Sequence, residues 1–138
     1  MSTENQKTQH PKIIAIDFDG CLCKNCYPEI GSPNWIAIFS AINEQKSGAK
    51  LILWTCRQGD LLKRAVLWCV RHGLYFDAVN DNLPEMVEAF NGSNSRKIFA
   101  NEYWDDRSVS VAWTHHPTEE ENDTFKYLIK RRMREGGR

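Results

Sequence analysis

The segment KIIAIDFDGC, residues 12–21, is the strongest indication of the fold that we expect for this chain. Its first half is a short run of β-branched and apolar residues after a polar segment, a pattern typical of a buried strand. Its second half, Asp17-Phe18-Asp19-Gly20, places two carboxylates and a glycine where that strand ends. Asp and Gly also favour ordinary turns, so this motif alone does not separate a polar turn from a functional site.

Strand-like and helix-like segments alternate along the chain. Short apolar runs typical of strands lie at 12–17, 51–54, 75–79, 97–104 and 109–113. Helical spacing of apolar residues predicts helices between them, and alternation of this kind is typical of a parallel sheet covered on both faces. The sequence therefore predicts an α/β fold, namely a single Rossmann-like three-layer domain with a mainly parallel five-stranded sheet. We expect a catalytic core over 12–135, after a disordered polar tail at 1–11.

Local patterns also predict where helices begin. Ser32 and Pro33 are typical of an N-cap and a first helical residue, and Asn82 with Glu85 is typical of a capping box. The segment 118–135 runs from acidic to basic, which complements a helix dipole. Its apolar residues predict an amphipathic helix with a buried stripe, made of Phe125, Leu128, Ile129 and Met133.

Composition excludes several classes of function. The 138 residues carry 18 Lys plus Arg against 18 Asp plus Glu, and this zero balance disfavours sequence-independent binding to nucleic acid. The basic end of the last helix is better interpreted as a solvated face than as a nucleic-acid contact. No apolar run reaches the length of a membrane span, and the polar N-terminus does not resemble a secretory signal. We therefore expect a cytoplasmic protein with no membrane partner.

Five cysteines agree with a reducing compartment, because their number is odd and none has an obvious partner. They are Cys21, Cys23, Cys26, Cys56 and Cys69. The cluster CLCKNC at 21–26 raises the alternative of a zinc site, which needs four Cys or His ligands. The histidines that would complete it, His72 or the pair His115-His116, stand at no recognised spacing, so free thiols are favoured.

Polar side chains follow three of the predicted strands. Asp17 and Asp19 follow the first strand, Thr55 follows the second, and the pair Asp105-Asp106 follows the fourth. The carboxyl ends of parallel strands meet at one edge of a sheet, so these groups are expected to lie close together. Several carboxylates at one edge repel each other unless a cation compensates, and hard oxygen ligands favour Mg²⁺.

Lys97 precedes the fourth strand and would lie at the opposite edge of the sheet unless that strand begins several residues later. With a lysine, a hydroxyl and a free carboxylate, an Mg²⁺ site is suited to phosphoryl transfer. A carboxylate can accept the phosphoryl group, and cations neutralise the charge of the phosphate.

Four segments taken in order, IDFDGC, LWTCR, SRKIF and YWDDR, resemble the four motifs of the haloacid-dehalogenase-like (HAD) hydrolases. This superfamily is dominated by Mg²⁺-dependent phosphatases, and the resemblance spans about residues 12–113. It implies that Asp17 is the nucleophile and a metal ligand. Asp19 would be the general acid and base, with its backbone carbonyl on the metal. The groups implied around the phosphate are Gly20, Thr55, Cys56 and Lys97.

The resemblance implies that Asp106 binds the metal directly and that Asp105 reaches it less directly or through water, although their order is left open. Neither gap between the motifs has room for a cap domain, so the chain resembles the small capless members. Such members act on macromolecules or use a neighbouring subunit to close the site, so a homo-oligomer is expected. The segment 21–33 takes the place of a flap over the entrance.

The expected function is a phosphatase that hydrolyses a small-molecule or macromolecular phosphate monoester through an aspartyl-phosphate on Asp17. The alternatives are a phosphotransferase and a catalytically weak protein that binds phosphate and Mg²⁺. The identity of the substrate is left open, because the same motifs serve sugar phosphates, nucleotides, phosphoproteins and nucleic-acid ends.

Overall fold

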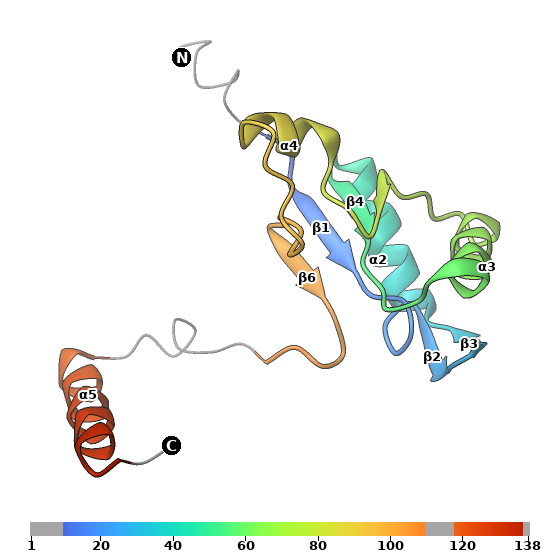
Figure 1. Cartoon of the computed structure of the whole chain (residues 1–138). Coiled ribbons are helices and arrows are strands. Elements are labelled where there is room, and N and C mark those ends of the chain that lie inside the picture. The colour runs from blue at the N-terminus through green and yellow to red at the C-terminus, as the bar shows by residue number, and fades with distance from the viewer. Residues whose placement is uncertain (1–9, 110–117, 137–138) are drawn as a thin grey trace. The chain divides into compact units, whose positions relative to one another are not determined.

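Strand β1 (Ile13–Ile16) lies inside a parallel sheet, and all four of its side chains are buried. The computed structural model describes residues 10–109 and 118–136, and the chain divides into two units, Met1–Arg107 and Ser108–Arg138. Within the described part of the first unit the sheet has four strands in the order β5-β4-β1-β6 (Figure 1). The other three strands are β4 (Lys50–Leu53), β5 (Ala78–Val79) and β6 (Glu102–Trp104).

The connections explain this strand order. Helix α2 (Trp35–Lys46) leads from β1 to β4, and α3 (Gly59–Arg71) leads from β4 to β5, so the chain first moves outward in one direction. Helix α4 (Pro84–Ala89) then leads to β6, which pairs with the free side of β1. The order of the strands therefore reverses at β1, and ligands of open α/β sheets bind at such a point.

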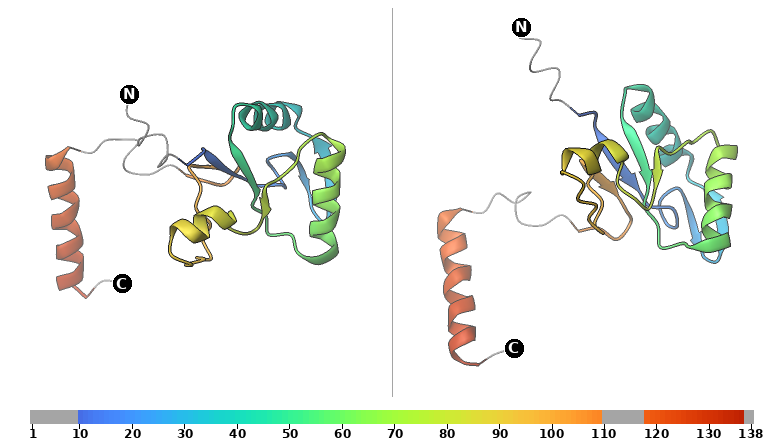
Figure 2. Two further views of the ribbon diagram at one scale, coloured as in Figure 1. Left: turned by 90° about the horizontal axis from the view of Figure 1, so that it is seen from above. Right: turned by 45° about the horizontal axis from the view of Figure 1, so that its top comes forward.

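Successive residues of a strand point to opposite faces of the sheet. Both faces of this sheet carry buried apolar side chains, and helices cover both. On one face, α2 and α3 pack against a core that includes Ile14, Ile16, Leu51 and Leu53. On the other face, Met86 of α4 packs with Leu83 and Ile98 against Ile13, Ala15 and Ile52. Figure 2 shows α4 and α2 on opposite sides of the sheet. The predicted α/β fold with three layers is confirmed in these residues.

A small antiparallel hairpin lies between β1 and α2. Its strands are β2 (Cys23–Cys26) and β3 (Glu29–Pro33). The predicted helix start at Ser32 is wrong, because Ser32 and Pro33 belong to β3 and Pro33 pairs with Cys23. Asn34 caps α2 instead, with its side-chain oxygen accepting the N–H of Ala37 at 3.3 Å.

The predicted capping box at Asn82 is also wrong. Helix α4 begins at Pro84, and its N-cap position is Leu83. Asn82 is 5% exposed, and its carboxamide instead joins the α4 entrance to the segment before β6. It donates to Asn94 Oδ1 at 2.9 Å and to the carbonyl of Ser95 at 3.2 Å, and it accepts the N–H of Phe99 at 2.7 Å. The buried carboxamide of Asn82 therefore bonds to groups in another segment and does not cap the helix.

The sheet has four strands in the described residues, whereas five were predicted. Residues 110–113 of the predicted fifth strand lie outside the described residues, and so do residues 1–9 of the predicted tail. Val109 is described and belongs to no strand.

The second unit contains helix α5 (Glu119–Arg134), which confirms the predicted C-terminal helix. Thr118 and Glu121 form a capping box at its start. The predicted burial of its apolar stripe is not found, since none of the described residues of α5 is buried. Among the described residues, no helix combines the length and the apolar content needed to span a membrane.

We expect the substitution Ile14→Val to lower the free energy of unfolding by about 0.5–1.5 kcal/mol, because it removes one methylene from a fully buried site in β1. The matched control Ile36→Val lies on α2 at 81% exposure, and its effect should stay within about 0.5 kcal/mol. Urea denaturation of both variants measures the difference. Equal effects would contradict the placement of β1 in the core.

Candidate active site

Three carboxylates meet where the strand order reverses. Asp17 follows β1, and Asp105 and Asp106 follow β6. The backbone N–H of Asp17 donates to the carbonyl of Trp104 at 2.9 Å, which extends the pairing of the two strands to their ends. One ligand oxygen from each of the three carboxylates lies within 4.8 Å of the others. The predicted convergence of these three side chains is therefore found.

The surroundings of the Asp17 carboxyl disfavour its ionised form. Burial raises the pKa of Asp17 to about 6, against the opposing hydrogen bond from the N–H of Phe18 at 2.8 Å. The nearby charges of Asp105, Asp106 and Asp19 add to the rise. A divalent cation would relieve this repulsion, because an opposite charge favours the ionised form.

The three carboxylates fit a hard divalent cation. Oxygen ligands of one Mg²⁺ lie about 3 to about 4 Å apart, because each Mg–O bond is about 2.0–2.1 Å long. The carboxylate oxygens, which lie within 4.8 Å of one another, are close to the spacing of such ligands. In the described residues this is the one group of three or more metal-ligating side chains, and it contains no cysteine. The zinc alternative based on residues 21–26 therefore gains no support.

A pocket of about 520 Å³ opens beside these carboxylates. It receives side chains from the ends of β1, β4 and β6 and from the hairpin. The lining residues are Asp17, Asp19, Asn25, Tyr27, Trp54, Thr55, Cys56, Asp105, Asp106 and Arg107. The hairpin therefore supplies Asn25 and Tyr27 to the wall of the pocket, in the place where a flap was expected.

Gly20 allows the close approach of two motifs. Its φ of +83° lies in the left-handed region, and a Cβ at this position would collide with Asp106 Oδ2. Its N–H donates to the carbonyl of Cys23 at 2.9 Å. Gly20 thus makes room for the Asp106 carboxylate, whereas its role in binding phosphate stays a prediction.

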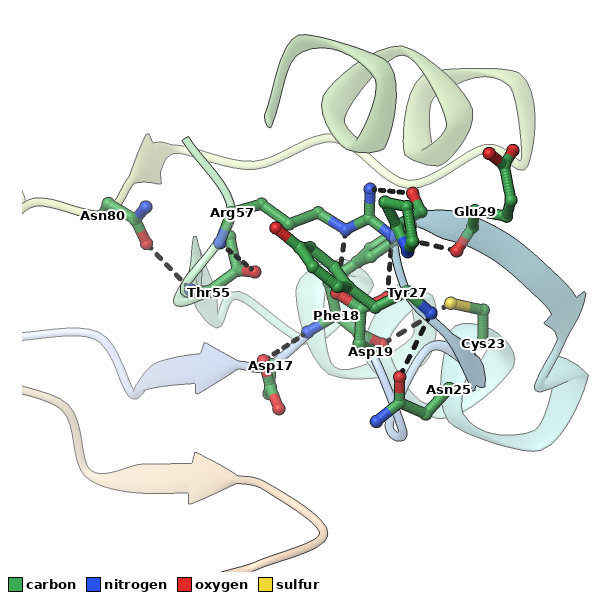
Figure 3. Close-up of polar contacts among 11 residues, drawn as sticks. Asp17, Phe18, Asp19, Cys23, Asn25, Tyr27, Glu29, Thr55, Arg57 and Asn80 are labelled. Carbon is green, nitrogen blue, oxygen red and sulfur yellow. Dashed lines mark hydrogen bonds and ion pairs between the residues drawn. The ribbon is translucent and has the colours of Figure 1, made fainter. Parts of the chain in front are cut away.

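Thr55 lies at the end of β4 and is held by two hydrogen bonds. Its N–H donates to Asn80 Oδ1 at 2.8 Å, and its hydroxyl oxygen accepts the N–H of Arg57 at 3.1 Å (Figure 3). Asn80 follows β5 with a φ of +51°, a conformation that Asn tolerates better than most residues. Thr55 and Cys56 both line the pocket, which agrees with the expected position of the second motif.

Lys97 lies on the connection before β6, because that strand begins only at Glu102. The condition under which Lys97 was expected near the site is therefore met. Lys97 is not among the residues that line the pocket, and its ammonium lies 5.6 Å from the ring centroid of Tyr103. Its action on a phosphate group stays a prediction.

Among the residues that line the pocket, Asn25, Trp54 and Arg107 were not predicted from the sequence. Arg57, which lies beside the site, was not predicted either. It follows β4, is 1% exposed, and donates from Nε and Nη2 to the two oxygens of Asp19, each at 2.8 Å (Figure 3). The segment LWTCR contains it, but an arginine in a strand-end loop is ordinarily solvated. The one signal in the sequence was its position two residues after Thr55, within a segment that resembles a HAD motif.

A comparison with solved structures identifies one relative from Bacteroides thetaiotaomicron, described as a conserved protein. Its structure matches this chain with a TM-score of 0.64 and 34% sequence identity, over 81% of this chain and 97% of that chain. The chain belongs to the family of this conserved Bacteroides protein. The description of the Bacteroides relative states no activity. No protein-family model and no curated protein matches the chain.

The raised pKa of Asp17 predicts how stability depends on pH. In metal-free protein the folded state takes up a proton at Asp17 near pH 6, whereas the unfolded state does so near the ordinary value of 3.8. This group therefore adds stability as the pH falls from about 7 to about 4. We expect Asp17→Asn to be more stable than the wild type at neutral pH, with the difference shrinking toward pH 4.

Thermal unfolding at a series of pH values in excess chelator measures this difference. Addition of Mg²⁺ near neutral pH should raise the Tm of the wild type and not that of Asp17→Asn. A difference between the two proteins that is the same at every pH would contradict the placement of Asp17 among like charges.

Gly20→Ala is expected to lower the free energy of unfolding by about 1 kcal/mol or more and to weaken Mg²⁺ binding. The added Cβ strains the backbone and displaces the Asp106 carboxylate. Gly48→Ala is the matched control, because Gly48 has a φ of +101° and nothing within 4 Å of an added Cβ. Titration calorimetry with Mg²⁺ separates them, and equal Mg²⁺ affinities would contradict the role assigned to Gly20.

Proposed function

We propose that this chain is an Mg²⁺-dependent phosphatase of the HAD-like type, with Asp17 as the nucleophile. The observation that carries the proposal is the meeting of Asp17, Asp105 and Asp106 within 4.8 Å at the reversal of strand order. Asp19 and Thr55 line the pocket beside them. Each of these residues belongs to a segment that resembles the corresponding HAD motif.

The carboxylates of Asp17, Asp105 and Asp106 would hold the metal, together with the backbone carbonyl of Asp19 that the resemblance implies. When bound, Mg²⁺ neutralises charge on the phosphate and acts as a Lewis acid. The chain as a whole has no net charge. The carboxylates at this site nevertheless carry a local excess of negative charge, which the bound cation would balance.

The reaction we propose has two steps. In the first, an oxygen of Asp17 forms a bond to phosphorus while the bond to the ester oxygen breaks, and Asp19 gives that oxygen a proton. In the second, Asp19 takes a proton from water as the water attacks the aspartyl-phosphate. The P–O bond to Asp17 then breaks, and inorganic phosphate leaves with the nucleophile restored.

Other groups would bind the transferring phosphoryl group. Thr55 presents a hydroxyl at the pocket, and its position is held by Asn80. We assign Lys97 to the charge of the phosphate, as in the resemblance, although Lys97 does not line the pocket. Arg107 is a lining residue of the pocket. The volume of about 520 Å³ agrees with a small-molecule monoester, since ligand pockets commonly measure about 300–1,000 Å³. A macromolecular monoester and a homo-oligomer that closes the site stay predictions.

Hydrolysis of p-nitrophenyl phosphate tests the proposal. We expect release of p-nitrophenol that requires Mg²⁺, stops in excess chelator, and falls by at least about 10³-fold in Asp17→Asn, because the nucleophile is removed. Asp123→Asn, an exposed position on α5, is the matched control and should keep the wild-type rate.

Two further measurements separate the alternatives. Phosphate transfer to an added alcohol in preference to water would indicate a phosphotransferase. Wild-type protein that binds Mg²⁺ but hydrolyses none of a broad panel of phosphate esters would favour a binding protein. Activity that survives in Asp17→Asn would contradict the mechanism.

A further inference from the structure

Arg57 is a cation buried beside the proposed site. Its side chain is 1% exposed, although it follows a strand end where most arginines reach solvent. A buried guanidinium is stabilised only when its N–H groups have partners, and four hydrogen bonds meet this requirement here. These four bonds go to two separate parts of the chain.

The first part is Asp19. Nε donates to Oδ2 and Nη2 donates to Oδ1, both at 2.8 Å, so the pair is bidentate. The planar fork of arginine matches a carboxylate in this geometry, which sets the orientation of the carboxylate as well as its position. Two of its about four lone-pair sites stay free, and Asp19 is itself a lining residue of the pocket.

The second part is the turn of the β2–β3 hairpin. Nη1 donates to the carbonyl of Pro28 and Nη2 to that of Glu29, each at 3.1 Å. The guanidinium carbon also lies 5.1 Å from the ring centroid of Phe18 and 5.2 Å from that of Tyr27. Figure 3 shows the guanidinium among Asp19, Tyr27 and Glu29.

We propose that Arg57 is a positioning residue that holds the Asp19 carboxylate and the β2–β3 hairpin together as one wall of the pocket. The same guanidinium orients the proposed acid and base and fixes the segment that carries Asn25 and Tyr27. Loss of the fork therefore releases both at once. This inference deepens the proposed function and rests on it for the role of Asp19.

A lysine cannot replace Arg57 in this arrangement. An ammonium is a point charge without a planar fork, so it does not pair with both oxygens of Asp19 and reach two carbonyls as well. Arg57→Lys keeps the charge and Arg57→Gln removes it, so the two variants separate charge from geometry. Arg64→Lys, at an exposed position of α3, is the matched control.

Alkylation of Cys23 by iodoacetamide reports on the hairpin without any substrate. Cys23 is 2% exposed at the start of β2, whereas Cys26 and Cys56 are exposed and serve as internal standards. Because labelling of a buried thiol follows local opening, we expect the rate at Cys23 to rise at least about tenfold in both Arg57 variants. Mass spectrometry of the digested protein gives the rate at each cysteine.

Kinetics with p-nitrophenyl phosphate report on Asp19. A misplaced catalytic group can cost about 10²-fold, so we expect kcat to fall by about that factor in Arg57→Lys and Arg57→Gln. KM should rise as well, because the released hairpin carries Asn25 and Tyr27, which line the pocket. A purely structural role would lower the amount of folded protein and leave kcat per folded molecule unchanged.

Tyr27→Leu gives a second, milder variant, because Tyr27 is 57% exposed and its loss does not disturb the core. It removes the aromatic ring that packs against the Arg57 guanidinium. We expect faster labelling of Cys23 and a lower kcat, with both changes smaller than in the Arg57 variants. This variant decides the question if the Arg57 variants do not fold. Wild-type labelling and wild-type kcat in Tyr27→Leu would then overturn the proposal.

The outcomes separate this proposal from the proposed function. Arg57 variants that label Cys23 at the wild-type rate, or that label it faster with unchanged kcat, overturn the role of Arg57 and leave the phosphatase intact. A wild-type protein without hydrolysis contradicts the phosphatase instead. In that case the labelling rates still decide whether Arg57 holds the hairpin.

Discussion

The backbone hydrogen bonds at the end of β1 are the constraint on which the site depends. The N–H of Trp54 donates to the carbonyl of Ile16, and the N–H of Asp17 donates to the carbonyl of Trp104, both at 2.9 Å. These two bonds hold the end of β1 between the ends of β4 and β6. Because the strands are parallel, the residues that follow them must emerge at one edge, and the carboxylates meet there whatever their mutual repulsion.

The carboxylates of Asp17 and Asp19 stand two residues apart but have different electrostatic surroundings. Asp19 has an internal partner, since the guanidinium of Arg57 contacts both of its oxygens. Asp17 accepts the N–H of Phe18 and lies near the charges of Asp105, Asp106 and Asp19, and its raised pKa reflects its burial and these charges. The cluster around Asp17 is therefore the part of the site whose charge a bound cation would balance, whereas the charge of Asp19 is already balanced by Arg57. The zero net charge of the chain does not reveal this division.

Patterns that depend on neighbouring residues predicted the structure well. Apolar runs located β1 and β4, and the helical spacing of apolar residues located α3, because burial of a regular face follows its periodicity. Predictions of helix starts were wrong at Ser32 and Asn82. In both places a contact with another segment competes with the preference for a helix start, since β3 pairs with β2 and Asn82 bonds to residues 94, 95 and 99.

The order of residues along the chain sets which chemical groups follow each strand. That information was enough to predict an α/β fold and the meeting of Asp17 with Asp105 and Asp106. The burial of Arg57 follows only from the packing of the folded chain, because its partners lie 28 to 38 positions away along the chain. Local preferences act over a few residues, whereas the partner of a buried charge is set by how distant segments pack.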